Sequence, residues 1–160
     1  MKDKLKQLKA CHKAREWAAN KTAQELFDTC PRGDWMLWLF RRTNPDDLQL
    51  FTLAKAHCAN TVRPLMTDER SLKAVDVAIA FGEGRATREE LDAAADAADA
   101  AAYYATAAAV AAAAAADAYG AADAYGAAAY YAAYVKKENQ KLTADICRKY
   151  LPFEIWNLNN

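Results

Sequence analysis

An alanine-rich stretch constrains the fold of this chain more than any other feature. Between Ala93 and Ala133, 27 of the 41 residues are alanine, and the remainder are Asp, Tyr, Thr, Val and Gly. Alanine is the strongest helix former, because its methyl group loses no rotamer freedom when the helix forms. The stretch is therefore expected to be helical.

The phase of the polar residues divides this stretch in two. At about 100° per residue, one side of a helix that starts near Arg88 collects a single row of mostly Asp and Tyr residues. The members of this row are Asp92, Asp96, Asp99, Tyr103, Thr106, Val110 and Asp117. The next acid, Asp123, is out of phase, so two antiparallel helices joined near Gly120 are expected. A rival interpretation breaks the first helix near Tyr103 and Tyr104, which gives three shorter helices.

The second of these helices is predicted to be amphipathic. One face carries Tyr130, Tyr134, Lys137, Lys141, Asp145 and Arg148. The opposite face carries Tyr131, Val135, Leu142, Ile146 and Tyr150. An apolar stripe at helical spacing normally faces the core, so the second set is expected to be buried.

Capping and turn residues predict several shorter helices before the alanine-rich stretch. An amphipathic helix is expected over residues 3–19, and Thr22 with Glu25 forms a capping box. Further helix starts are predicted at Asp34, at Asn44-Pro45 and at Thr67. The helix that starts at Thr67 is expected to end at Gly82 and Gly84. Thr87 with Glu90 forms a second capping box. Residues 35–40 are six consecutive large apolar residues, which predicts the hydrophobic centre of the protein.

The expected fold class is all-α, a multi-helix bundle with a long alanine-rich antiparallel helical hairpin. We expect a single domain over residues 1–160, built from a core of short helices (1–86), the alanine-rich helices (87–150) and a tail that packs back (151–160). Alanine faces pair between chains as readily as within one, so the sequence leaves a homodimer open.

The charge distribution argues against some partners. The formal charge is zero, but residues 1–43 carry a net +5 and residues 91–135 a net −5 with no cation. Nucleic acid needs Lys and Arg to neutralise phosphate, so it is not an expected partner of the alanine-rich helices. The amino terminus lacks the apolar run of a secretory signal and no segment is typical of a membrane span, so a cytoplasmic protein with reduced cysteines is expected.

No catalytic or metal-binding signature is present. Cys11-His12 and His57-Cys58 are neighbours in sequence, so their side chains point about 100° apart on a helix and neither pair can chelate a metal. The sequence therefore predicts no metal, no cofactor and no enzyme activity. An enzyme that uses a Cys and a His brought together by the fold remains a third class of hypothesis.

The row of Asp and Tyr residues is the candidate partner-binding surface. We assign to it Asp92, Asp96, Asp99, Tyr103, Asp117, Tyr130 and Tyr134. Tyr is enriched at interfaces, and a row of aspartates without cations attracts a basic partner. The alternative interpretation is a solvated face that keeps an alanine-rich helix soluble.

Several segments resemble the alanine-rich immunity protein family, whose members are encoded by bacteria and their phages. The matching segments are Cys11 with Trp17, the run RGDWMLWL from Arg32 to Leu39, Arg63-Pro64, KAVD from Lys73, GEGRAT from Gly82, the alanine-rich helices, and DICRKY from Asp145. The resemblance implies an all-helical, non-enzymatic protein that neutralises a cognate toxin.

Two binding functions are therefore expected ahead of an enzyme. The first is an immunity-type inhibitor that binds a partner protein, such as a toxin, through an exposed helical face. The alternative is a phage anti-defence protein that binds a host defence protein, or that holds a nucleotide-like small molecule in an aromatic pocket among the helices.

Overall fold

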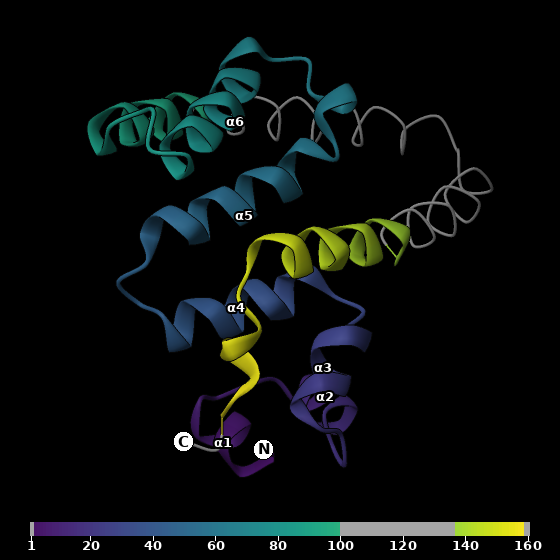
Figure 1. The fold of residues 1–160 in the computed structure, drawn as a ribbon. Helices are drawn as coiled ribbons and strands as arrows, with labels where there is room; N and C mark the ends of the chain where they lie inside the picture. The colour runs from purple at the N-terminus through teal and green to yellow at the C-terminus, as the bar shows by residue number, and fades with distance from the viewer. Residues whose placement is uncertain (1, 100–136, 159–160) are drawn as a thin grey trace, which may run out of the picture.

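The computed structural model describes residues 2–99 and 137–158, and everything stated below concerns these residues (Figure 1). Within them the chain forms helices and turns but no strand. The predicted all-α fold class is confirmed. None of the helices in this part of the chain is long and apolar enough to cross a membrane.

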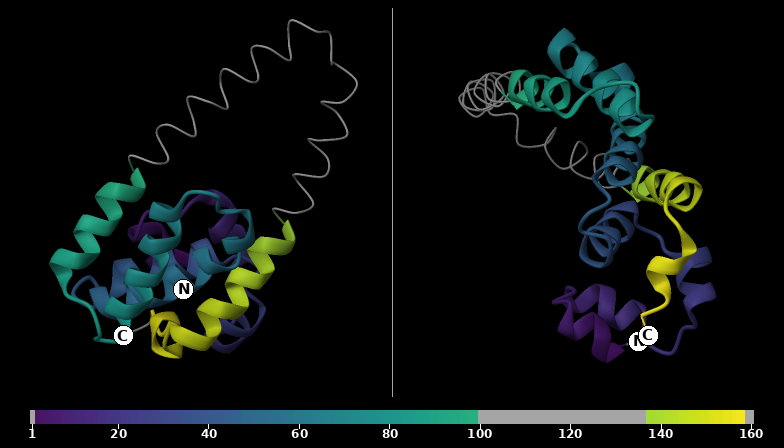
Figure 2. Two further views of the ribbon diagram at one scale, coloured as in Figure 1. Left: turned by 90° about the horizontal axis from the view of Figure 1, so that it is seen from above. Right: turned by 60° about the vertical axis from the view of Figure 1, so that its left-hand side comes forward.

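Helices α1 to α6 follow one another along a stack, and segment 137–150 lies in its middle, beside α4 and α5 (Figure 1). Their bounds are α1 Lys2–Gln7, α2 His12–Trp17, α3 Ala23–Thr29, α4 Gly33–Thr43, α5 Leu48–Asn60, η1 Arg63–Leu65, α6 Glu69–Gly82 and η2 Phe153–Trp156. Residues 88–99 and 137–150 are also helical. α1 and α2 lie at one end of the stack and α6 with segment 88–99 at the other, while segments 88–99 and 137–150 run along different sides (Figure 2).

α4 is the centre of the hydrophobic core. Met36, Leu39 and Phe40 are almost completely buried. Around them lie buried residues from α1, α3, α5, segment 137–150 and the tail: Leu5, Leu26, Ala54, Ala144, Cys147, Leu151, Ile155 and Trp156. The apolar run of residues 35–40 is thus the hydrophobic centre that the sequence predicts, although Trp35 and Trp38 are only half-buried.

Segment 137–150 crosses the start of α4 at very short range. A Cβ atom added to Gly33 would lie 2.6 Å from the carbonyl carbon and oxygen of Thr143. The Cys147 thiol contacts the Gly33 carbonyl, with Sγ 3.5 Å from the oxygen. Only small side chains fit between two backbones at this separation, so glycine is required at position 33.

The predicted core face of segment 137–150 is wrong in part: Tyr150 packs against the core, but Leu142 does not. The short distance to α4 explains the difference. Ala144 and Cys147 are the residues that pack against the core, whereas Leu142 is 49% exposed. Ile146 and Tyr150 are half-buried. Large side chains cannot enter the narrow interface with α4, so the small residues face it. Tyr131 and Val135 lie outside the described residues.

Arg148 joins segment 137–150 to α3. Its Nη1 atom donates to the backbone carbonyls of Phe27 (3.2 Å) and Cys30 (2.9 Å), at the carboxyl end of that helix. Its Nη2 atom donates to Asp145 Oδ1 at 2.6 Å. The last carbonyls of a helix have no partner within it, so a cation that bonds to them stabilises the helix end.

The single helix predicted over residues 3–19 is instead a pair, α1 and α2, and that prediction is wrong. The chain turns at Lys9, whose backbone φ is 63°. The Lys9 N–H donates to the Lys6 carbonyl (3.0 Å) and the Ala10 N–H to the Leu5 carbonyl (2.9 Å), which is the Schellman arrangement of a helix end. The turn lets both Leu5 and Ala10 be buried, which one straight helix would not allow.

Both predicted capping boxes are confirmed. The Thr22 N–H donates to Glu25 Oε2 (2.7 Å) and the Glu25 N–H to Thr22 Oγ1 (3.2 Å). Thr87 and Glu90 make the same pair of bonds, at 2.8 and 3.2 Å. Both motifs need only four consecutive residues, which is why the sequence predicts them well.

Three predicted helix starts are displaced. The residues before α4, α5 and α6 are Arg32, Asp47 and Asp68, in place of the predicted Asp34, Asn44 and Thr67. Asp34 does not cap α4, because its carboxylate accepts two hydrogen bonds from the Arg32 guanidinium.

The predictions for the tail and for the cysteines are confirmed, and those for the alanine-rich stretch are not tested. The tail packs back as expected, since Ile155 and Trp156 in η2 are buried. All four cysteines are free thiols, as predicted. The turn near Gly120 and its rival, the break at Tyr103 and Tyr104, lie outside the described residues, and the single-domain organisation stays a prediction.

Replacing Gly33 by alanine should destabilise the protein. The new methyl group would collide with the Thr143 backbone, and we expect a loss of about 2–3 kcal/mol in the free energy of unfolding. Gly84→Ala is the control: nothing lies within 4 Å of its Cβ position, but its φ is 75°, so only about 1 kcal/mol should be lost. Urea unfolding followed by circular dichroism measures both, and equal losses would contradict the close approach of α4 and segment 137–150.

Candidate functional site

The four tryptophans of the chain line a single cavity of about 460 Å³. Trp17 comes from α2, Trp35 and Trp38 from α4, and Trp156 from η2. Residues of α1, α2, α4 and η2 line the cavity. α1 and α2 lie at one end of the molecule (Figure 1). We call it the tryptophan pocket.

The Trp17 ring contacts two of the other indole rings. The centroids of Trp17 and Trp35 are 5.8 Å apart with the planes tilted by 50°, and Trp156 meets Trp17 nearly edge-on at 6.4 Å. These distances are typical of aromatic pairs that stabilise each other. Trp156 is 3% exposed, while Trp17, Trp35 and Trp38 are half-buried. The pocket therefore has a fixed aromatic wall and partly accessible rings.

The rim of the tryptophan pocket is cationic. Three basic residues, Lys9, Lys13 and Arg32, and one acid, Asp34, line it. Lys9 and Lys13 are exposed. The rim thus combines three positive charges with one negative charge, which favours an anionic ligand.

Arg32 is held in place by two neighbours. Its Nε and Nη2 atoms donate to Asp34 Oδ1 and Oδ2 at 2.9 and 2.6 Å, and its guanidinium lies over the Trp35 ring, 4.9 Å from the centroid. The hydrogen bonds to Asp34 raise the pKa of Arg32. A bidentate pair of this kind fixes the orientation of the guanidinium. Arg32 therefore holds the Trp35 ring in a defined position.

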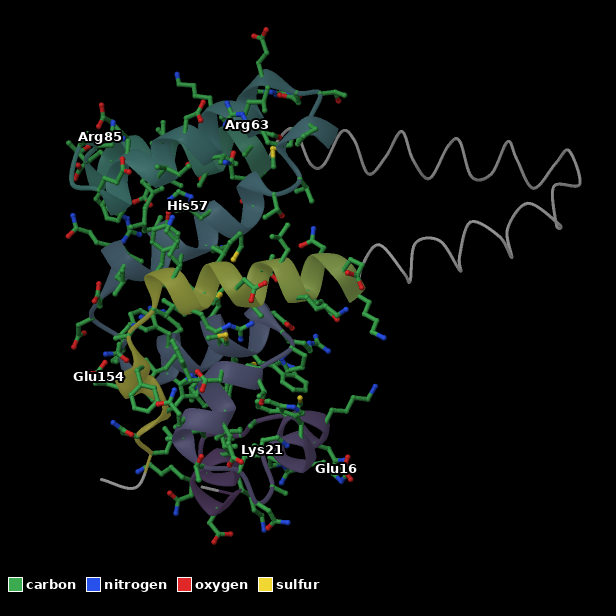
Figure 3. The ribbon with its side chains drawn as sticks, turned by 45° about the vertical axis from the view of Figure 1, so that its right-hand side comes forward. Glu16, Lys21, His57, Arg63, Arg85 and Glu154 are labelled. Atoms are coloured by element: carbon green, nitrogen blue, oxygen red, sulfur yellow. The ribbon has the colours of Figure 1, made fainter. Side chains whose placement is uncertain are left out.

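Lys21 adds a cation on the Trp17 side of the pocket (Figure 3). Its Nζ atom lies 5.0 Å from the Trp17 ring centroid and donates to the Trp17 carbonyl oxygen. Cation–π contacts of this geometry are favourable, and the hydrogen bond ties Lys21 to the end of α2. Arg42 lies over the Trp38 ring, 5.9 Å from the centroid, so three of the four tryptophans carry a cation of the chain on one ring face.

The sequence predicts an aromatic pocket only as part of the alternative small-molecule hypothesis, and it does not name the residues that line the pocket. Its members come from residues 5–18, 32–39 and 156, so no local pattern joins them. The turn at Lys9, which brings α1 back beside α2, is also missed because the position is not glycine. The one available signal is the resemblance itself, because Trp17 and the RGDWMLWL run are among its matching segments.

The described part of the predicted Asp and Tyr surface lies on segment 88–99, at the far end of the molecule from α1 and α2 (Figure 1). Asp92, Asp96 and Asp99 are exposed on segment 88–99. Asp92 accepts from Arg88 Nε at 2.8 Å, so its charge is partly compensated. Tyr103, Asp117, Tyr130 and Tyr134 lie outside the described residues. The assignment of this surface to partner binding stays a prediction.

The thiols and imidazoles do not form an activated pair in the part of the chain that the structure describes. Burial raises the pKa of Cys30 to about 11. The Cys58 and Cys147 sulfurs are 3.8 Å apart. Their hydrogen bond, together with burial, raises the pKa of Cys147, and the same hydrogen bond lowers the pKa of Cys58. His57 stacks on Tyr150, with centroids 4.3 Å apart. Within residues 2–99 and 137–158, no group of three His, Cys, Asp or Glu residues could hold a metal ion.

Comparisons of this chain with protein-family models, with curated proteins and with solved structures give no match.

Thiol reactivity should single out Cys11. This residue is exposed and lines the tryptophan pocket, whereas Cys30 and Cys147 are buried and Cys58 is half-buried. We expect iodoacetamide to modify Cys11 in the native protein at least tenfold faster than Cys30, because the thiolate is the reactive form and burial disfavours it. Mass spectrometry of the labelled peptides measures the rates. Equal rates for Cys11 and Cys30 would contradict the burial of Cys30 in the core.

Proposed function

We propose that this protein is a non-enzymatic binding protein of the cytoplasm that holds a flat aromatic anion, such as a nucleotide, in the tryptophan pocket. The observation that supports the proposal is the gathering of all four tryptophans around one cavity with Lys9, Lys13 and Arg32 on its rim. Aromatic faces recognise flat rings, and cations recognise acidic substituents.

The size and lining of the pocket suit a small molecule. Pockets for small ligands occupy about 300–1,000 Å³ and combine apolar walls with a few polar groups, and this cavity lies within that range. Stacking of one base on an aromatic side chain contributes about 1–3 kcal/mol to binding. The half-buried rings of Trp17, Trp35 and Trp38 are the surfaces available for such stacking.

Two of the thiols, Cys30 and Cys147, are unsuited to nucleophilic catalysis, which supports binding without catalysis at these two positions. A nucleophilic cysteine needs a lowered pKa, because the thiolate is the attacking form. Cys30 and Cys147 have raised pKa values instead, so both are neutral thiols at physiological pH. In this proposal the protein acts by sequestering its ligand, which is the alternative anti-defence role expected from the sequence.

Ligand binding should depend on Trp35. We expect adenosine monophosphate, or another member of a nucleotide panel, to quench tryptophan fluorescence and to raise the Tm. Trp35→Leu should weaken this binding about tenfold, the loss expected when one stacking ring is removed.

Phe51→Leu is the matched control for this experiment. Phe51 packs in parallel on Phe40, with centroids 6.4 Å apart, and lies away from the tryptophan pocket. The substitution should lower stability by about 1 kcal/mol and leave ligand affinity unchanged. If no nucleotide or related aromatic anion shifts the Tm of the unmodified protein, the proposed ligand class is wrong.

A second candidate function is neutralisation of a toxin protein, which the resemblance to immunity proteins implies. The supporting observation is the exposure of Asp92, Asp96 and Asp99 on one helical segment. A partner with a basic surface would suit these carboxylates.

Charge reversal tests this second candidate. Asp96→Lys combined with Asp99→Lys should abolish capture of the partner that the unmodified protein retrieves from a lysate of cells that carry its gene. Asp28→Lys, at an exposed position in α3, is the control and should retain capture. Retention of the partner by the double variant would identify the aspartates as a solvated face only.

A further inference from the structure

We propose that Lys9 is the residue of the tryptophan pocket that contacts the acidic group of the ligand. The inference deepens the proposed function and rests on it. It assigns the ligand an aromatic ring system, held against the tryptophans, with a phosphate, sulfonate or carboxylate group directed at the ammonium of Lys9.

The backbone of Lys9 is the first observation. Its φ of 63° lies in the left-handed region, at the position of a Schellman motif where glycine is the usual residue. The described residues contain one other non-glycine residue of this kind, Asn20, with φ 62°. Asn adopts this conformation readily, but Lys does not. Lys9 therefore occupies a position where glycine would be more stable.

The place of Lys9 is the second observation. It lines the tryptophan pocket, it is exposed, and it is the residue at which the chain turns from α1 towards α2. Unfavourable backbone conformations gather at functional sites, where the surrounding structure maintains them. A further unfavourable feature borders the same cavity, because the buried Trp156 Nε1 atom has no acceptor in the described part of the chain.

The other cations of the rim are less suited to the acidic group. Arg32 already gives two hydrogen bonds to Asp34 and lies over Trp35, so its charge is largely compensated. Lys13 lies within α2 in an ordinary helical conformation. Lys9 carries the unfavourable φ, and we therefore assign the acidic group of the ligand to it.

Two dyes with the same ring system test the assignment. Anilinonaphthalene sulfonate is an aromatic anion, and phenylnaphthylamine is the same ring system without the sulfonate. Their affinities for the full-length protein are measured by fluorescence titration, together with the Tm of each variant. Three variants are compared. Lys9→Gly removes the charge and also the strain of the left-handed backbone conformation, whereas Lys9→Ala removes only the charge. Lys9→Arg keeps both the positive charge and the strained backbone. Lys55→Ala, at an exposed position in α5, is the control for net charge.

We expect Lys9→Gly to weaken binding of the anionic dye about 3- to 10-fold and to leave the neutral dye unchanged. Its Tm should rise by about 2 °C, because glycine adopts the left-handed conformation without strain. Lys9→Ala should show the same loss for the anion without the rise in Tm. Lys9→Arg and Lys55→Ala should bind both dyes as the unmodified protein does.

Two results would overturn the assignment. If Lys9→Gly and Lys9→Ala bind the anionic dye as tightly as the unmodified protein, Lys9 does not contact the acidic group, although the pocket itself still binds. If both dyes weaken equally, Lys9 shapes the cavity and does not recognise charge. Failure of the unmodified protein to bind either dye would instead refute the proposed function.

Discussion

The contact between Gly33 and the backbone of Thr143 is the constraint on which the rest of the structure depends. It brings segment 137–150 so close to α4 that only small residues, Ala144 and Cys147, fit in the interface. The same approach places Arg148 against the end of α3, and it leads the chain through Leu151 into η2. Trp156 therefore reaches the tryptophan pocket because α4 begins with a glycine, which lets segment 137–150 pass close by.

α4 contributes to the core and to the pocket at once. Met36, Leu39 and Phe40 are buried in the core, while Trp35 and Trp38 turn to the cavity that α1 and α2 cover. An apolar run of six residues has no polar face, so it needs neighbours on all sides. The α1–α2 pair is one of these neighbours, and the proposed ligand would complete the cover over the remaining aromatic surface.

The sequence predicts features well when they depend on neighbouring residues, and poorly when they depend on residues far apart in the chain. The Thr22–Glu25 and Thr87–Glu90 boxes are local motifs, and they occur where predicted. Burial of Leu142 was wrongly predicted because helical periodicity carries no information about the distance to α4. The turn at Lys9 was missed because its residue type disfavours the observed φ. The tryptophan pocket joins three distant segments, which only the folded chain brings together, and this is why its members could not be named in advance.

Recognition of a flat anion by the tryptophan pocket can be tested with a proton–nitrogen correlation spectrum recorded while adenosine monophosphate is added. We expect the indole signals of Trp17, Trp35 and Trp38 and the backbone amide of Ala10 to shift together, while the amides of Ala56 and Val75, in α5 and α6, remain in place. Shifts confined to α5 and α6, with all four indole signals unchanged, would contradict recognition at this pocket.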